Sequence, residues 1–251
     1  MFWKLCKFEW KSSYRLYVMF YAILLACSII IGMSSIPDIK PSVLEYLIAI
    51  VVIIYTSGIF AIHIITVVFI FRNYIQTMYK RQSYLTHTLP VATWQLQLVK
   101  LLSALLWLIL TFLVTLMSFW IMMLFAGSDV YGEIFHVFQL VWEEIPFHFE
   151  LLLSLLYALL EIVETISLVY FVINLIHSTY IQRSRTVIAI VTVLALIMAE
   201  SFGFNLLNDF LGNTSLSYAA CIMLNIGISI VLIALWNYAS VYLLDNKMEV
   251  E

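Results

Sequence analysis

Charged residues are scarce in this chain, and their scarcity excludes an ordinary soluble fold. Only 11% of the 251 residues are Asp, Glu, Lys or Arg, whereas 64% are hydrophobic. A soluble domain has about a quarter charged residues and about half apolar ones. Lipid must therefore solvate much of this chain.

Cysteine is also rare, and histidines are isolated from one another. Cys6, Cys27 and Cys221 are the only cysteines, and their spacing matches neither a disulfide framework nor a zinc site. His63 and His177 lie in or beside apolar segments and have no companions at ligand spacing. We therefore predict apolar packing roles for the cysteines and no metal site.

The chain also lacks the G-x-x-x-x-G-K-[ST] loop that binds nucleotide phosphates. Its nearest match, Gly127 to Gly132, is followed by Glu133 instead of lysine. No segment between the apolar runs exceeds about 30 residues, and a separate domain needs at least about 50. We predict that the chain is not an enzyme, binds no cofactor itself and, without a large basic patch, binds no nucleic acid.

Positive charge is missing from long stretches of the sequence and gathered in a few places. Eleven of the twelve lysines and arginines flank the apolar segments in four clusters, and Lys40 is the exception. Cytoplasmic loops of membrane proteins are enriched in Lys and Arg, so this pattern predicts six spans with both termini in the cytoplasm. The four clusters are Lys4, Lys7, Lys11 and Arg15; Arg72, Lys80, Arg81 and Lys100; Arg183 and Arg185; and Lys247.

The long apolar runs between these basic clusters predict an all-α integral membrane protein. Residues 1–15 are too charged to span and predict an amphipathic helix on the cytoplasmic surface. Residues 246–251 form a cytoplasmic tail, and residues 73–84 form a short cytoplasmic helix. The fifth span is expected to be interrupted at Ser201-Phe202-Gly203. The transmembrane domain covers 16–245, with helices at about 16–35, 43–71, 96–126, 151–176, 186–204 and 218–243.

Three acids lie inside the predicted spans. Glu161 and Glu164 share one helix face with Tyr157 near the centre of the fourth span. An intramembrane carboxylate costs about 2.5–3.5 kcal/mol, so it should face water or protein. The pair therefore lines either a substrate path or a hydrogen-bonded clasp with partners such as Asn174 or Asn225. For Glu200, on the fifth span, we expect a structural role. The candidate pathway residues are Tyr157, Glu161, Glu164, Glu200 and Asn174.

Two segments resemble a known transporter family. Tyr84-Leu85-Thr86-His87-Thr88-Leu89-Pro90-Val91, followed by Lys100-Leu101-Leu102, resembles the "YLT-x-TLPV" and "sKLL" stretches of six-span ABC exporter permeases of the type-two class. The opening Lys4-Leu5-Cys6-Lys7-Phe8-Glu9-Trp10-Lys11 is similar to theirs. Many relatives carry an acid and a glycine before the tyrosine, where this chain has Arg81-Gln82-Ser83. The subgroup, and with it the substrate, stays open.

The resemblance implies a bacterial plasma-membrane permease with separate partners. Two cytoplasmic ABC ATPase subunits would bind ATP and Mg²⁺, and a second permease copy or a paralogue would complete the dimer. The helix at 73–84 would couple to the ATPase, and the substrate would be amphipathic, in the class of cationic peptides or lipid-like molecules. The implied coupling residues are Arg72, Asn73, Tyr74, Gln76, Lys80 and Arg81.

Two alternatives remain from the sequence. One is a membrane subunit that binds a peptide and confers immunity without transport. The other is an intramembrane hydrolase built from Glu161, Glu164 and His177, although His177 lies about 20 Å along the helix from Glu164.

Overall fold

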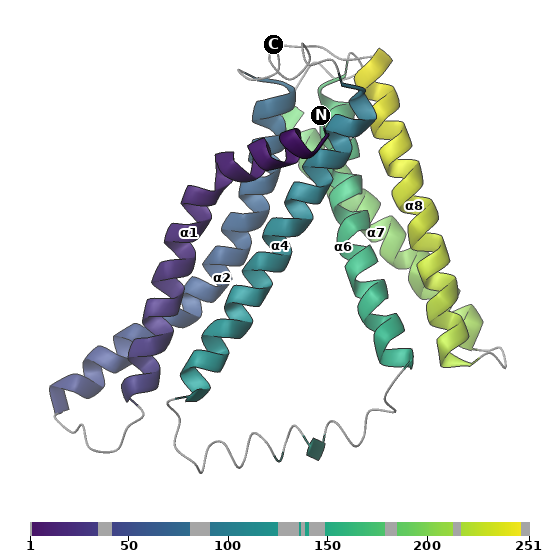
Figure 1. The fold of residues 1–251 in the computed structure, drawn as a ribbon. Coiled ribbons are helices and arrows are strands. Elements are labelled where there is room, and N and C mark those ends of the chain that lie inside the picture. Colours follow the sequence, from purple (N-terminus) through teal and green to yellow (C-terminus); the bar gives the residue numbers. More distant parts are fainter. Residues whose placement is uncertain are drawn as a thin grey trace. The chain divides into compact units, whose positions relative to one another are not determined.

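The described parts of the chain are almost entirely helical. The structure, a computed structural model, describes residues 2–34, 42–80, 91–124, 136, 139–140, 149–178, 185–212 and 217–246. Figure 1 shows the long helices as α1 (Phe2–Ser34), α2 (Ser42–Met78), α4 (Thr93–Leu124), α6 (Phe149–Ile176), α7 (Arg185–Gly212) and α8 (Tyr218–Asn246).

Each of the six helices contains a segment long and apolar enough to cross a membrane. These segments are 21 to 32 residues long, and a span needs about 20. The prediction of an all-α multi-pass membrane fold is therefore confirmed. The segments are Ser13–Met33, Ala49–Met78, Thr93–Leu124, Phe149–Ile176, Val187–Leu211 and Tyr218–Asn246.

The expected interruption in the fifth span is wrong. Helix α7 runs without a break through 201–203 and ends at Gly212. Gly203 stays within the helix, and a Cβ placed there would meet nothing within 4 Å. A glycine inside a helix costs about 1 kcal/mol, which does not stop a long apolar helix by itself. As a result Asn208 and Asp209 belong to α7 and not to a loop.

The two helices expected outside the bilayer join longer ones. Residues 2–15 are the first turns of α1, and Figure 1 shows them at an angle to the rest of that helix. Trp3 and Phe8 are exposed on these turns, whereas Cys6 is buried. Residues 73–78 form the end of α2, and residues 81–84 lie outside the described residues. The membrane-surface and coupling roles of these segments stay predictions.

The chain divides into two compact units, each formed from separate stretches of sequence. The first comprises Met1–Ile70 and Leu102–Glu144. Within it, the hydroxyl of Thr111 on α4 lies 2.8 Å from that of Tyr21 on α1 and 3.2 Å from that of Thr66 on α2. Tyr17 stacks on Trp107 with ring centroids 4.0 Å apart. Side-chain hydroxyls and aromatic rings therefore join three otherwise apolar helices.

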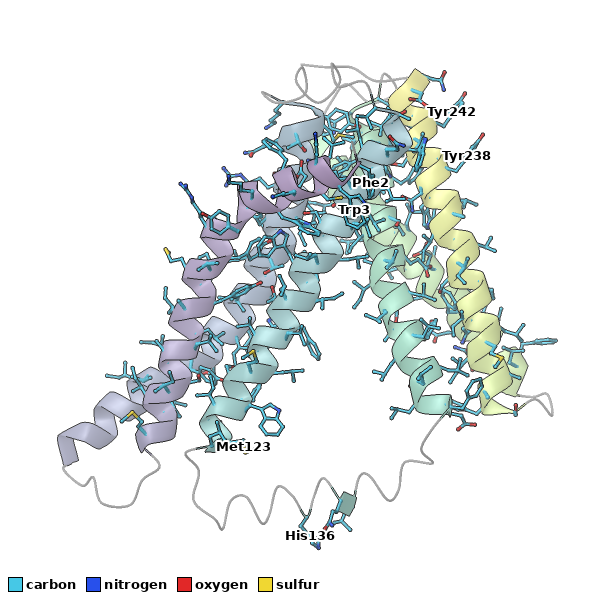
Figure 2. The ribbon with its side chains drawn as sticks, in the orientation of Figure 1. Phe2, Trp3, Met123, His136, Tyr238 and Tyr242 are labelled. Atoms are coloured by element: carbon cyan, nitrogen blue, oxygen red, sulfur yellow. The ribbon has the colours of Figure 1, made fainter. Side chains whose placement is uncertain are left out.

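The second unit comprises Phe71–Leu101 and Ile145–Glu251, and it holds the candidate site. Here α6 packs against both α7 and α8. Helix α8 begins after Ser217, whose carbonyl and hydroxyl accept the Ala220 backbone N–H at 3.0 and 3.4 Å. Tyr238 and Tyr242 project away from α8 near its end (Figure 2), and both are exposed. Exposed tyrosines near a helix end are typical of a membrane–water interface.

Candidate functional site: a polar cavity between α6 and α7

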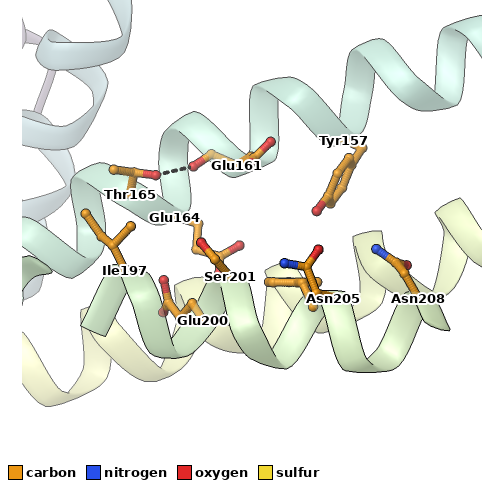
Figure 3. A pocket seen from close by; sticks show the side chains of 10 residues that line it. Tyr157, Glu161, Glu164, Thr165, Ile197, Glu200, Ser201, Asn205 and Asn208 are labelled. Atoms are coloured by element: carbon orange, nitrogen blue, oxygen red, sulfur yellow. Dashed lines mark hydrogen bonds between the residues drawn. The ribbon is translucent and has the colours of Figure 1, made fainter. Parts of the chain in front are cut away.

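A cavity of about 390 Å³ lies between α6 and α7 within the second unit. Figure 3 shows side chains of both helices entering the space between them. Its described lining combines three carboxylic acids with hydroxyl, amide and aromatic groups, and no basic residue is among these described side chains. From α6 the lining residues are Tyr157, Glu161, Glu164 and Thr165, and from α7 they are Ile197, Glu200, Ser201, Phe204, Asn205 and Asn208.

Helical spacing brings these side chains to one face of each helix. Residues three or four apart on a helix are neighbours on its surface, which joins Tyr157, Glu161 and Glu164 on α6. The same spacing places Ser201 and Asn208 on a common face of α7, and this face continues across Gly203 because the helix is unbroken. Glu164 lies 15 residues after Phe149, about 22 Å into a helix that rises 1.5 Å per residue. The cavity therefore opens near the middle of a membrane span.

Glu164 is the most deeply buried acid of the cavity. Its residue is 4% exposed, and its Oε2 atom has no hydrogen-bond partner among the described residues. The buried Ser229 hydroxyl on α8 is the neighbouring donor of this carboxylate, but the two groups do not reach hydrogen-bond geometry. A buried polar atom without a partner costs about 1–3 kcal/mol, and more if it is charged. Glu164 thus has a neutral hydroxyl beside it and no cationic partner among the described lining residues.

Glu200 has a different environment from Glu164. The Trp236 indole Nε1 on α8 donates to Glu200 Oε1 at 2.9 Å. Toward the far end of α7, the Asn225 amide on α8 donates to Asn208 Oδ1 at 3.0 Å. These two bonds tie α7 to α8 beside the cavity. Glu200 therefore has the structural contact expected of it, in addition to its place in the lining.

The remaining polar lining residues are exposed at the surface of the chain. Glu161, Ser201 and Asn205 are exposed, although each lies inside a spanning segment. The Thr165 hydroxyl is also exposed, and it donates to the Glu161 carbonyl of its own helix at 2.9 Å, as the dashed line in Figure 3 marks. Polar groups at membrane depth must meet water, a ligand or another protein surface. This face is therefore suited to contact with one of these and not with lipid tails.

The acids of the cavity are not arranged to ligate a metal ion. Within the described ranges, no three His, Cys, Asp or Glu side chains form a group that could hold one. His177, the third residue of the hydrolase alternative, is not in the cavity lining. Its ring instead stacks on Tyr79 at 4.3 Å, and its Nδ1 lies 2.9 Å from the Ile173 carbonyl. The described geometry therefore gives no support to an intramembrane hydrolase.

Asn174 lies in a second polar cluster and not in the cavity. Its Oδ1 atom accepts hydrogen bonds from the hydroxyls of Tyr74 at 2.9 Å and Tyr79 at 2.7 Å. Its amide nitrogen donates to Ser240 of α8, whose hydroxyl donates to Gln97 Oε1 at 2.9 Å. Asn174 is 1% exposed. We call these five residues the tyrosine–amide cluster; it joins the ends of α2, α6 and α8 to the beginning of α4.

The candidate coupling residues divide between this cluster and the surface. Tyr74 is buried and stacks on Tyr170 at 4.0 Å, so it is unsuited to contact a partner protein. Arg72, Gln76 and Lys80 are exposed, and Asn73 is half-buried. Arg81 lies outside the described residues.

Tyr79 follows α2 directly and is a member of the cluster that the sequence did not single out. Burial, and secondarily the neighbouring Tyr74, raises the pKa of Tyr79 above its usual range. Its hydroxyl therefore stays protonated and able to donate to Asn174 at neutral pH. Tyr79 thus links the end of α2 to α6.

Several lining residues of the cavity were also missed from the sequence. Ser201, Phe204, Asn205 and Asn208 follow the helical spacing that starts at Ile197. That periodicity was a usable signal, but the assumed interruption at 201–203 concealed it.

No family model, curated protein or solved structure matches this chain.

Proposed function

We propose that this chain is the transmembrane permease subunit of an ATP-binding-cassette exporter that moves an amphipathic substrate out of the cell. The observation that carries the proposal is the acidic cavity near the middle of a pair of spanning helices. Intramembrane acids are costly and are kept where they line a solute path or bind a solute. The resemblance of residues 84–102 to exporter permeases implies that ATP hydrolysis drives transport. Because this chain has no phosphate-binding loop of its own, a separate subunit would hydrolyse the ATP.

The tyrosine–amide cluster supports a route from an ATPase to the cavity. Arg72, Gln76 and Lys80 would meet the ATPase at the cytoplasmic end of α2. At the same end, Tyr74 and Tyr79 bond to Asn174 of α6, the helix that carries Glu161 and Glu164. A push on the end of α2 would thereby reach α6. Alternating access then requires two discrete packings of the spans, since packed interfaces do not deform continuously.

The proposal includes the partners of the subunit. Two cytoplasmic ATPase subunits bind ATP and Mg²⁺, and a second permease copy or a paralogue completes the membrane assembly. The site of action is the bacterial plasma membrane, with both termini in the cytoplasm. This chain contributes the solute path and binds no cofactor.

Co-purification from native membranes tests the proposal. We expect an ATPase subunit to accompany the wild-type chain and to be lost when Arg72, Lys80 and Arg81 are all changed to Glu, because these charges lie at the coupling segment. The matched control keeps the charge: Arg72→Lys, Lys80→Arg and Arg81→Lys together should retain the partner.

One outcome would contradict the exporter assignment, and another only the coupling role of the segment at 72–81. If no ATPase accompanies the wild type, the cavity belongs to a subunit that binds a peptide for immunity without transporting it. If the ATPase persists in the Glu variant, coupling does not use this segment.

A further inference from the structure

We propose that the cavity between α6 and α7 binds an organic cation with one ammonium group and an apolar tail, and that Glu164 is its counterion. This inference rests on the proposed function and names the substrate class of the same cavity. It starts from the Oε2 atom of Glu164, which is buried and makes no hydrogen bond among the described residues, with only the neutral Ser229 hydroxyl beside the carboxylate. An ammonium donor satisfies that acceptor and offsets its buried charge.

Glu164 is the acid of the cavity that is buried and has no charged partner or formed hydrogen bond at its Oε2 atom among the described residues. Glu200 has a donor in Trp236 and is committed to holding α7 against α8. Glu161 is exposed, so its charge is better screened and its attraction for a cation is weaker. Because one carboxylate of the cavity is buried without a cationic partner, we expect a ligand that carries one ammonium group.

The size of the cavity favours an organic ligand over a metal ion. Small-molecule pockets have volumes of about 300–1,000 Å³, and this one measures about 390 Å³. Its acids form no metal-holding group within the residues that the structure describes. A ligand of several non-hydrogen atoms can contact Glu164 and still fill the remaining space.

The walls of the cavity supply surfaces for both parts of such a ligand. Tyr157 and Phe204 meet edge to face, with ring centroids 6.5 Å apart, and Ile197 adds aliphatic surface for a tail. Aromatic faces also attract cations. Among the residues that the structure describes, three acids and no Lys, Arg or His line the cavity, so an anionic ligand is disfavoured.

Three ligands of nearly equal shape test the charge requirement on the full wild-type chain. The chain is placed in nanodiscs of zwitterionic phosphatidylcholine and titrated calorimetrically with 4-phenylbutylamine, 4-phenylbutanol or 4-phenylbutyrate, with empty nanodiscs subtracted. We expect saturable binding at one site for the amine and none for the acid. Equal affinity for the alcohol and the amine would overturn the inference, because charge would then contribute nothing.

Matched variants test the role of Glu164. Glu164→Gln keeps the shape and removes the charge, and we expect it to weaken amine binding at least about tenfold, equivalent to about 1.4 kcal/mol. Glu150→Gln changes an acid on the same helix outside the lining and should leave affinity unchanged. Unaltered binding by Glu164→Gln would overturn the assignment of the counterion. If that variant does not fold, the ligand series on the wild type decides the question alone.

The outcomes for the ligand class and for the exporter assignment are separable. Binding in nanodiscs requires no ATPase. Absence of amine binding in a chain that co-purifies with an ATPase overturns the ligand class alone. Amine binding without any ATPase partner supports the ligand class and counts against the exporter.

Discussion

At the scale of single residues, Asn174 joins three buried polar side chains from two other helical segments. Its amide group serves two tyrosine hydroxyls and one serine, and every member of that set is buried. A buried asparagine is expensive unless the fold places hydrogen-bond partners beside it. The cluster therefore specifies how the ends of α2, α6 and α8 meet.

Asn174→Leu should destabilise the chain because it removes the acceptor of Tyr74 and Tyr79 and leaves both hydroxyls buried without it. We expect a loss of about 1–3 kcal/mol in the free energy of unfolding, measured by denaturant titration in detergent micelles. Tyr79→Phe removes one donor only and should cost about 0.5–1.5 kcal/mol. Asn246→Leu is the matched control on an exposed position and should change stability by less than about 0.5 kcal/mol. An Asn174→Leu chain as stable as wild type would show that the cluster does not hold the helices together.

At the scale of elements, α7 decides how the cavity is built. Its unbroken path past Gly203 aligns Ser201, Asn205 and Asn208 with the acids of α6. Most of the side chains along α7 are exposed in the single chain. With few buried apolar side chains on α7, the hydrogen bonds that Glu200 and Asn208 accept from α8 are important for holding α7 in place.

Gly203→Ala should stabilise the protein if α7 is continuous. Alanine favours a helix interior over glycine by about 0.5–1 kcal/mol, and the added methyl group meets nothing within 4 Å. Gly227→Ala, on α8 and equally uncrowded, is the parallel control and should give a gain of similar size. The measurement is again the free energy of unfolding in micelles. A loss of stability specific to Gly203→Ala would mean that this position departs from a helix in the functional protein, as the sequence had predicted.

The sequence predicts these elements well and the cavity in part. Long apolar runs between charged clusters show where the spans lie, because only helices with satisfied backbones cross lipid. Glu161, Glu164 and Glu200 stand out as acids inside such runs, and they do meet in one cavity. The position of Asn174 could not be foreseen, because its partners Tyr74 and Ser240 lie 100 and 66 residues away in the sequence. Pairings over such distances depend on tertiary packing, which helical periodicity does not encode.

At the scale of the whole molecule, the distribution of positive charge predicts a single orientation in the membrane. Lys4, Lys7 and Lys11 on α1 and Lys80 after α2 are exposed. The segment between α4 and α6, residues 125–148, contains no Lys or Arg. Short loops rich in Lys and Arg stay in the cytoplasm, so the two groups should lie on opposite sides of the bilayer.

Single-cysteine labelling of whole cells tests this orientation. In a chain with Cys6, Cys27 and Cys221 changed to Ala, a membrane-impermeant maleimide should label Ser128→Cys in intact cells. Lys4→Cys and Lys80→Cys should react only after the membrane is permeabilised, because translocation of their basic segments is disfavoured. Labelling of Lys80→Cys in intact cells would place the end of α2 outside, where no ATP-hydrolysing subunit could reach it. That result would contradict the exporter assignment even if the cavity binds its cation, since binding in the cavity needs no particular orientation whereas coupling to ATP does.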